Sequence, residues 1–147
     1  MLRRQNQLRE YIKPNVILPL SLHDTRISDI VIENDTITFV FDDGIYIIED
    51  KEAVRSGKAT VSFYNVDFDF CRVSCIERNF YRKQMDIRDF AKKLAQDLVI
   101  IEIIDETYGY NQAKFSCIII TEEQWIDCHI DIYHFGPMKY LWEEGKE

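Results

Sequence analysis

The sequence predicts an α+β domain of about seven or eight mainly antiparallel strands, with one amphipathic helix near residues 86–98. Runs that alternate apolar and polar residues, separated by short polar turns, are typical of antiparallel strands. One segment instead places apolar residues at helical spacing, and strands and helices do not alternate along the chain. A doubly wound nucleotide-binding fold is therefore disfavoured. We expect the helix to cover one face of a curved sheet or to close a barrel-like end.

Both ends of the chain are expected to lie outside the main sheet. Residues 1–14 are predicted to form either a short helix over Gln5–Ile12, which a proline would end, or an arm. Residues 136–147, which begin with Gly-Pro, are predicted to form a loosely packed tail. Together with the segment between them, they make up one domain over residues 1–147.

The first half of the chain predicts a three-stranded antiparallel meander. Its strands and turns are, in order, Arg26–Glu33, Asn34-Asp35, Thr36–Phe41, Asp42-Asp43-Gly44 and Ile45–Ile48. Short Asn-Asp and Asp-Gly turns between alternating β-branched runs are strong markers of hairpins. Residues 49–57 are expected to form a polar loop, and Ala59–Phe70 a further strand. A β-bulge near Tyr64-Asn65 would keep the apolar residues of this strand on one face, and a bend between two strands is the alternative.

The second half of the chain predicts the helix and the remaining strands. Cys71–Phe80 is expected to continue as a strand. Asp86 can cap a helix over Asp86–Leu98, in which five apolar residues form one stripe. The segments after the helix are a strand buried on both faces, a turn, and a hairpin whose two strands flank Thr121-Glu122-Glu123. Their ranges are Val99–Asp105, Glu106–Asn111, Ala113–Ile120 and Gln124–Phe135.

Length, charge and hydropathy exclude several classes of protein. A chain of 147 residues can bury a core without a metal or disulfide. Asp and Glu outnumber Lys and Arg by 26 to 18, and the net charge of −8 disfavours a protein that binds nucleic acid through its phosphates. No apolar run reaches the roughly 18–20 residues that span a bilayer. The basic start lacks the apolar region of a secretory signal, so a cytoplasmic location is predicted.

Motifs for covalent catalysis and cofactor binding are absent from the sequence. There is no Gly-x-Ser-x-Gly, no phosphate-binding glycine loop and no His-Glu-x-x-His, so no catalytic residue and no cofactor are predicted. The four cysteines do not form a Cys-x-x-Cys pair and are expected to be buried thiols in a reducing compartment. A zinc site made from two distant pairs is the alternative. The cysteines are Cys71, Cys75, Cys117 and Cys128.

Polar residues in the last long strand are the candidate binding residues. Asp127, His129 and Asp131 alternate with apolar residues, so they are expected to share one polar face. Glu122 and Glu123 stand at the turn before this strand. We predict that these five residues contact a protein partner. A strand whose other face is buried gives the same pattern without any function.

The histidines also suggest a metal site or an acid–base pair. Asp127, His129 and Asp131 could bind a divalent metal if His134 or Glu102 added a fourth ligand. A site that combines His23 and Asp24 with His129 is also predicted. With the nearby carboxylates they would suit a small metal-dependent or acid–base hydrolase. That function requires His23 and His129 to meet across the fold. The alternative is that Asp24 accepts a turn-type hydrogen bond and His23 only packs beside it, which would explain this pair of residues without catalysis.

Charge is distributed unevenly along the chain. Residues 1–70 carry −4, residues 71–93 carry +4 and residues 94–147 carry −8. A basic segment between acidic flanks is typical of a surface that steers a protein partner. Ordinary solvated charge that keeps a domain soluble is the alternative.

Leu22-His23-Asp24 leads into the first strand of the predicted meander, and an acidic turn that ends in Gly44 follows some twenty residues later. This arrangement resembles the opening of small uncharacterised bacterial proteins, some of which are grouped with the immunity proteins of toxin–immunity systems. The resemblance covers about thirty residues and carries over no catalytic residue. It implies a cytoplasmic, non-catalytic, β-rich domain that binds and blocks a toxin.

Together, these observations favour a protein-interaction domain over an enzyme. The leading hypothesis is an immunity-like inhibitor that binds an unidentified protein through an acidic surface. The hydrolase is the first alternative, and a β-domain that binds a small molecule in an aromatic pocket is the second. A homodimer is also predicted, in which Ala113–Ile120 is an edge strand that pairs with its copy.

Overall fold

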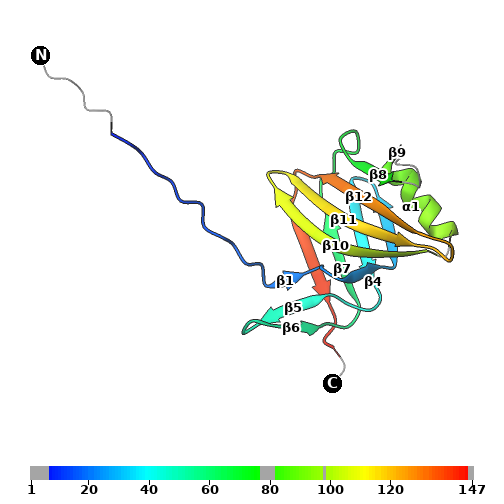
Figure 1. Cartoon of the computed structure of the whole chain (residues 1–147), viewed down its shortest axis with the longest axis horizontal. Coiled ribbons are helices and arrows are strands. Elements are labelled where there is room, and N and C mark those ends of the chain that lie inside the picture. Colours follow the sequence, from blue (N-terminus) through cyan, green and yellow to red (C-terminus); the bar gives the residue numbers. More distant parts are fainter. Residues whose placement is uncertain (1–6, 77–81, 98, 146–147) are drawn as a thin grey trace, which may run out of the picture.

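The computed structural model describes residues 7–76, 82–97 and 99–145, which form thirteen strands and one helix (Figure 1). The α+β class, with mostly antiparallel strands and a single helix, is confirmed. The strands are more numerous than the sequence predicts. In the described part of the chain, no helix has the length and apolar character needed to cross a membrane.

The strands form three antiparallel sheets. The six-stranded sheet contains β2 (Thr25–Ile27), β10 (Ile100–Gly109), β11 (Gln112–Ile120), β12 (Trp125–Tyr133), β8 (Arg72–Ile76) and β9 (Arg82–Met85). The four-stranded sheet contains β13 (Met138–Trp142), β7 (Ala59–Phe63), β4 (Thr36–Phe41) and β3 (Asp29–Glu33). The small sheet contains β1 (Leu20–Ser21), β5 (Tyr46–Glu49) and β6 (Glu52–Arg55).

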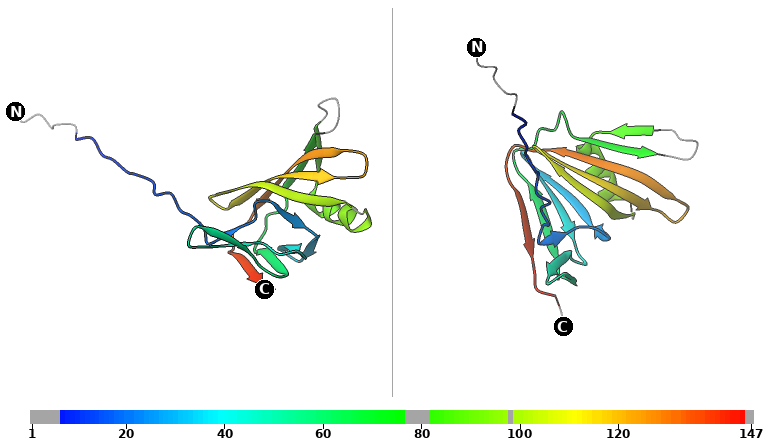
Figure 2. Two further views of the ribbon diagram at one scale, coloured as in Figure 1. Left: turned by 60° about the horizontal axis from the view of Figure 1, so that its bottom comes forward. Right: turned by 60° about the vertical axis from the view of Figure 1, so that its left-hand side comes forward.

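The six-stranded and four-stranded sheets face each other across the core (Figure 2). The chain passes between them three times, from β2 to β3, from β7 to β8 and from β12 to β13. β2 and β3 are separated only by Ser28, whose N–H donates to the Val40 carbonyl at 2.7 Å. β12 and β13 are joined through His134, which forms a bridge with Val66. Among the described residues the sheets remain separate, so the barrel-like closure is not confirmed.

Phenylalanine rings from both sheets fill the centre of the core. Phe39 and Phe63 of the four-stranded sheet and Phe115 of the six-stranded sheet are fully buried. Their ring centroids lie 5.3 to 6.0 Å apart in edge-to-face geometry. This arrangement suits the ring quadrupoles, so the cluster joins the two sheets.

The helix α1 (Ile87–Gln96) confirms the predicted amphipathic helix and lies where the two sheets diverge (Figure 2). The Asp86 carboxylate accepts a hydrogen bond from the Arg88 N–H, as an N-cap does, and also contacts the Arg88 guanidinium at 2.9 Å. These bonds from Arg88 lower the pKa of Asp86 to about 2. The buried residues of α1 all belong to the predicted apolar stripe: Ile87, Phe90, Ala91 and Leu94.

The predicted meander is only partly formed. β3 and β4 pair across the two-residue turn Asn34-Asp35, as expected. β5, however, pairs with β1 and β6, because the turn that ends in Gly44 directs it into the small sheet. Residues 49–57 are not a loop. β5 and β6 form a hairpin across Asp50 and Lys51, which both adopt positive φ, as a tight hairpin turn requires.

The segment after β7 also departs from the prediction. β7 ends at Phe63, and Asn65 has a φ of 52°, so the chain turns here instead of continuing through a bulge. Phe70 is exposed rather than part of the core face. β8 covers the first part of the predicted strand over Cys71–Phe80, and residues 77–80 lie outside the described residues.

A β-bulge lies in β10, where the sequence does not predict one. The register with β11 slips between Ile103 and Asp105. The slip turns the side chains of Glu106 and Tyr108 towards the interior. The strand also continues to Gly109, through the residues that were predicted to form a turn. β10 is buried on one face, not on both, because its residues alternate between buried and exposed.

Both ends and the proposed edge strand need correction. Residues 7–19 contain no helix and project from the body (Figure 1). The expected loose tail instead contains β13, which pairs with β7 over five residues. β11 lies between β10 and β12, so its backbone is already paired on both sides. It therefore cannot form a homodimer as an edge strand.

Candidate interaction surface

The predicted polar face of β12 lies on the outer side of the six-stranded sheet. Asp127 and His129 are exposed and Asp131 is half-buried, whereas the alternate residues point into the core. His129 Nδ1 lies 3.4 Å from the Ser116 hydroxyl on β11. Glu122 is exposed in the turn that leads into the strand, next to Glu123. The expected alternation is therefore present.

This outer face carries both signs of charge. Asp131 lies directly across from Lys114 on one neighbouring strand and from Arg72 on the other. Glu102 and Arg26 form an ion pair at 3.7 Å on the same sheet. Basic neighbours therefore offset the charge of Asp131 but not that of Asp127, which lies opposite Ile118 and Ile76. The remaining acidic surface consists of Asp127 and of Glu122 and Glu123 in the turn that precedes β12.

The histidines do not assemble into a metal site. His23 Nδ1 contacts Asp24 Oδ2 at 3.1 Å, but both side chains are exposed. β10 and β11 lie between β2, which follows this pair, and the strand that carries His129. Three strand spacings amount to about 14 Å. His134 Nδ1 instead lies 2.9 Å from the Gly136 carbonyl. The described residues contain no group of three His, Cys, Asp or Glu that could hold a metal ion.

Three cysteines form a row across the inner face of the six-stranded sheet. Cys128 lies opposite Cys117 on β11 and opposite Cys75 on β8. Burial raises the pKa of the Cys117 thiol to about 12, and the pKa of Cys128 is raised by its hydrogen bond with Cys75 and by burial. Cys117 and Cys128 therefore remain neutral thiols, as the sequence suggests.

Glu106 is a half-buried acid that the sequence did not reveal. Glu106 accepts a hydrogen bond from the Leu22 N–H at 2.6 Å. Tyr108 and Tyr140 lie beside it, with their hydroxyl groups 3.5 Å apart. Burial raises the pKa of Glu106, and the bond from Leu22 opposes this shift. No described pocket opens onto Glu106, so we assign it a structural role.

The raised pKa of Glu106 predicts how pH affects stability. The folded state favours the protonated acid, so this contribution is complete below the unfolded-state pKa and is lost as pH rises through the folded-state pKa. Glu106→Gln should keep the acceptor for Leu22 and remove this pH dependence. Glu106→Ala should cost about 1–3 kcal/mol, because the Leu22 N–H loses its partner. Urea unfolding between pH 4 and 8 measures both effects, and an unchanged pH dependence in Glu106→Gln contradicts the assignment.

Several strongly exposed apolar residues lie in residues 7–19, which we call the N-terminal arm. Leu8, Tyr11, Ile12, Val16 and Ile17 are 76 to 101 % exposed. Among the described contacts, the arm makes one backbone hydrogen bond, from Ile48 N–H to the Pro19 carbonyl at its base. The sequence suggested an arm as an alternative, but not that its apolar residues would lack packing partners.

The arm and the rest of the chain have opposite charges. Residues 7–19 contain two basic residues and one acid, a net charge of +1, and Arg3 and Arg4 precede them in the sequence. Since residues 1–19 sum to +3 and the whole chain carries −8, residues 20–147 carry −11. The protein can thus offer a partner a basic, apolar strand beside an acidic body.

Comparisons with models of protein families, with curated proteins and with solved structures found no match to this chain. The resemblance to immunity proteins therefore remains a prediction.

Proposed function

We propose that this chain is a protein-interaction domain that binds its partner through the N-terminal arm and the adjoining acidic body. In this proposal it acts by occupying a surface of the partner and not by chemistry. Because the segment that begins at Leu22 resembles immunity proteins, we propose that the partner is a toxin and that binding inhibits it.

The exposure of the arm is the observation that carries the proposal. Folded proteins rarely leave a contiguous apolar segment in water unless it meets another surface. Ordering such a segment on a partner releases water from its apolar side chains and compensates for the lost chain entropy. Thirteen extended residues reach about 40 Å, which matches a protein surface better than a small molecule.

The backbone of the arm supports a particular mode of binding. Its N–H and C=O groups between Gln7 and Leu18 have no backbone partner among the described contacts. An extended segment with free backbone groups can add a strand to the sheet edge of another protein. Pro14 lacks an N–H donor, so we expect Asn15–Leu18 to be the paired part.

Charge supports a second contact on the body. Asp127, Glu122 and Glu123 lie in or directly after the β11–β12 turn, beside the exposed Trp125. Trp is enriched at the centres of protein interfaces, where acidic neighbours select a basic partner. The five residues predicted from the sequence thus remain candidates, with Asp131 the weakest because Lys114 and Arg72 flank it.

A photo-crosslinker placed at Val16 of the full chain in its native host tests the proposal. We expect Tyr11→Asp with Ile17→Asp to reduce the crosslinked partner about tenfold or more, since anchor residues each contribute about 2 kcal/mol. Asp127→Lys should weaken capture independently. Val54→Asp, at an exposed apolar residue of β6, is the matched control.

The arm variants should leave the melting temperature unchanged, because Tyr11 and Ile17 are almost fully exposed to solvent. Light scattering of the pure chain distinguishes self-association from binding to a different protein. Capture that persists in both the arm and the Asp127 variants would contradict the proposal.

A further inference from the structure

We propose that the cavity between α1 and the inner face of the six-stranded sheet binds a small amphipathic carboxylate, the size of an eight-carbon fatty acid. This site is separate from the arm and from the outer face of β12. The inference does not depend on the proposed function.

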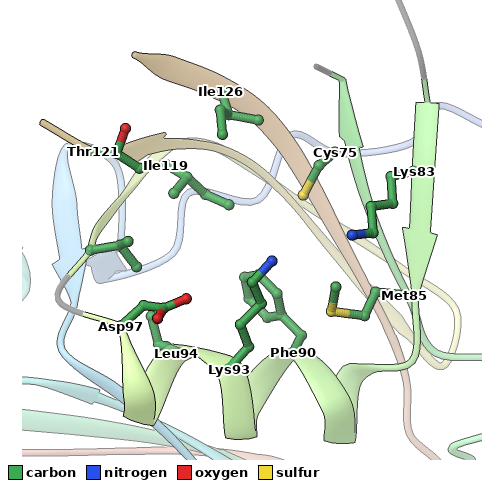
Figure 3. A pocket seen from close by; sticks show the side chains of 11 residues that line it. Cys75, Lys83, Met85, Phe90, Lys93, Leu94, Asp97, Ile119, Thr121 and Ile126 are labelled. Atoms are coloured by element: carbon green, nitrogen blue, oxygen red, sulfur yellow. The ribbon is translucent and has the colours of Figure 1, made fainter. Parts of the chain in front are cut away.

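The cavity is apolar and has a definite size. It encloses about 200 Å³, and its apolar walls come from α1, β9, β11, β12 and the chain before β10 (Figure 3). These walls include Met85, Phe90, Leu94, Val99, Ile119 and Ile126. An apolar cavity of about 150 Å³ accommodates the six carbons of benzene, so a volume of about 200 Å³ has room for roughly eight carbons. Water in such a space finds few polar partners, so an apolar chain should displace it favourably.

Two lysines provide the cationic part of the site. Lys83 on β9 and Lys93 on α1 direct their ammonium groups into the cavity, as Figure 3 shows. Neither forms an ion pair with any described residue, whereas Arg88 on the same helix is paired with Asp86. Unpaired ammonium groups above an apolar wall complement a carboxylate with an apolar tail.

The rest of the lining sets the orientation and the charge of the ligand. Asp97 and Thr121 lie at the opposite end from Lys83 (Figure 3). An anionic head group would be repelled by Asp97 and attracted by the lysines, so the head belongs at the lysine end. Two ammonium groups and one carboxylate suit a single negative charge better than a polyphosphate.

Titration of the full chain with sodium octanoate, followed by calorimetry and by amide chemical shifts, tests the inference. Octanoate should bind in the millimolar range or tighter and shift the resonances of Phe90 and Ile119. Its seven carbons beyond the carboxylate fill the available space, so dodecanoate should bind no more tightly. 1-Octanol, which has no charge, should bind less tightly than octanoate.

Variants separate the apolar and the cationic contributions. Lys83→Met and Lys93→Met should each weaken octanoate binding about threefold and together about tenfold, as partly exposed ion pairs do. Lys92→Met is the matched control, since Lys92 is exposed on the same helix and does not line the cavity. Ile126→Trp should fill the cavity and abolish binding, whereas Ile118→Trp, on the opposite face of the sheet, should not.

Three results would overturn the inference: no octanoate binding up to 10 mM, equal binding of 1-octanol, or unchanged binding in the double lysine variant. If Ile126→Trp fails to fold, the lysine pair and the 1-octanol comparison still decide. None of these results depends on the arm, so they test the cavity separately from the proposed function.

Discussion

Phe39→Ala should destabilise the protein by about 3–5 kcal/mol, a typical cost for removing a buried phenylalanine. Phe39 lies in the middle of β4 and is fully buried. Its ring contacts Phe41, Phe63 and Phe115, with centroid distances of 5.3 to 6.5 Å. Since Phe115 belongs to the six-stranded sheet, the substitution opens a cavity where the two sheets meet.

The expected loss is large because domains of this size are only marginally stable, by about 5–15 kcal/mol. Urea unfolding should show a lower midpoint with an unchanged slope, as expected when the core is weakened and the unfolded state is not. Phe70→Ala is the control, since Phe70 is 60 % exposed and meets only Tyr133 among the described ring contacts. Equal losses in the two variants would show that the phenylalanine cluster does not hold the sheets together.

Local patterns predicted the elements whose partners lie close in sequence. The β3–β4 and β11–β12 hairpins pair within a short stretch of chain, and the cap and backbone hydrogen bonds of α1 are also local. The alternation of apolar residues, the capping residue and the turn residues were therefore sufficient to predict these elements from the sequence. Sheet membership was not predictable in the same way, because it depends on distant partners. β5 pairs with β1 across an intervening stretch of other strands, and β7 pairs with β13, which lies more than 70 residues further along the chain.

The bulge in β10 shows why single residues mattered. One extra residue between Ile103 and Asp105 reverses the faces of everything that follows in the strand. Glu106 and Tyr108 thus become interior residues, although their polarity suggests a turn. The sequence contains no glycine or proline at this point that would mark the bulge.

In the candidate sites, too, features within one strand were predictable from the sequence, and features that combine several elements were not. The shared face of Asp127 and His129 follows from the strand period and was predicted. The basic neighbours of Asp131 lie on other strands, so the sequence pattern of β12 did not predict them. The cavity combines Lys83 with Lys93 through the packing of α1 beside β9, and no spacing in the sequence indicates that these side chains converge.

Gly44→Ala should cost about 2–5 kcal/mol, because it adds backbone strain to a steric clash. Gly44 has a φ of 85°, which residues with a side chain rarely adopt. A Cβ atom at this position would clash with the Ser56 carbonyl oxygen, and backbone cannot move aside as a flexible side chain can. Thermal unfolding should show a melting temperature lower by several degrees.

Gly109→Ala is the matched control. There the added Cβ would meet the side chain of Gln112, which is free to rotate away. The loss of unfolded-state entropy should offset part of that cost, so the net change should stay within about 1 kcal/mol. A Gly44 variant no less stable than the Gly109 variant would contradict the role of the turn.

The consequences of Gly44→Ala should extend to binding. The turn places Ile45, which exchanges hydrogen bonds with Ser56 through Ser56 Oγ at 2.9 Å and Ser56 N–H at 2.8 Å. β5 follows directly, and its Ile48 N–H holds the base of the N-terminal arm at Pro19. A shifted turn would therefore release the arm from the body. We expect Gly44→Ala to weaken partner capture even at temperatures where the core remains folded, whereas Phe39→Ala should weaken capture only as the whole domain unfolds.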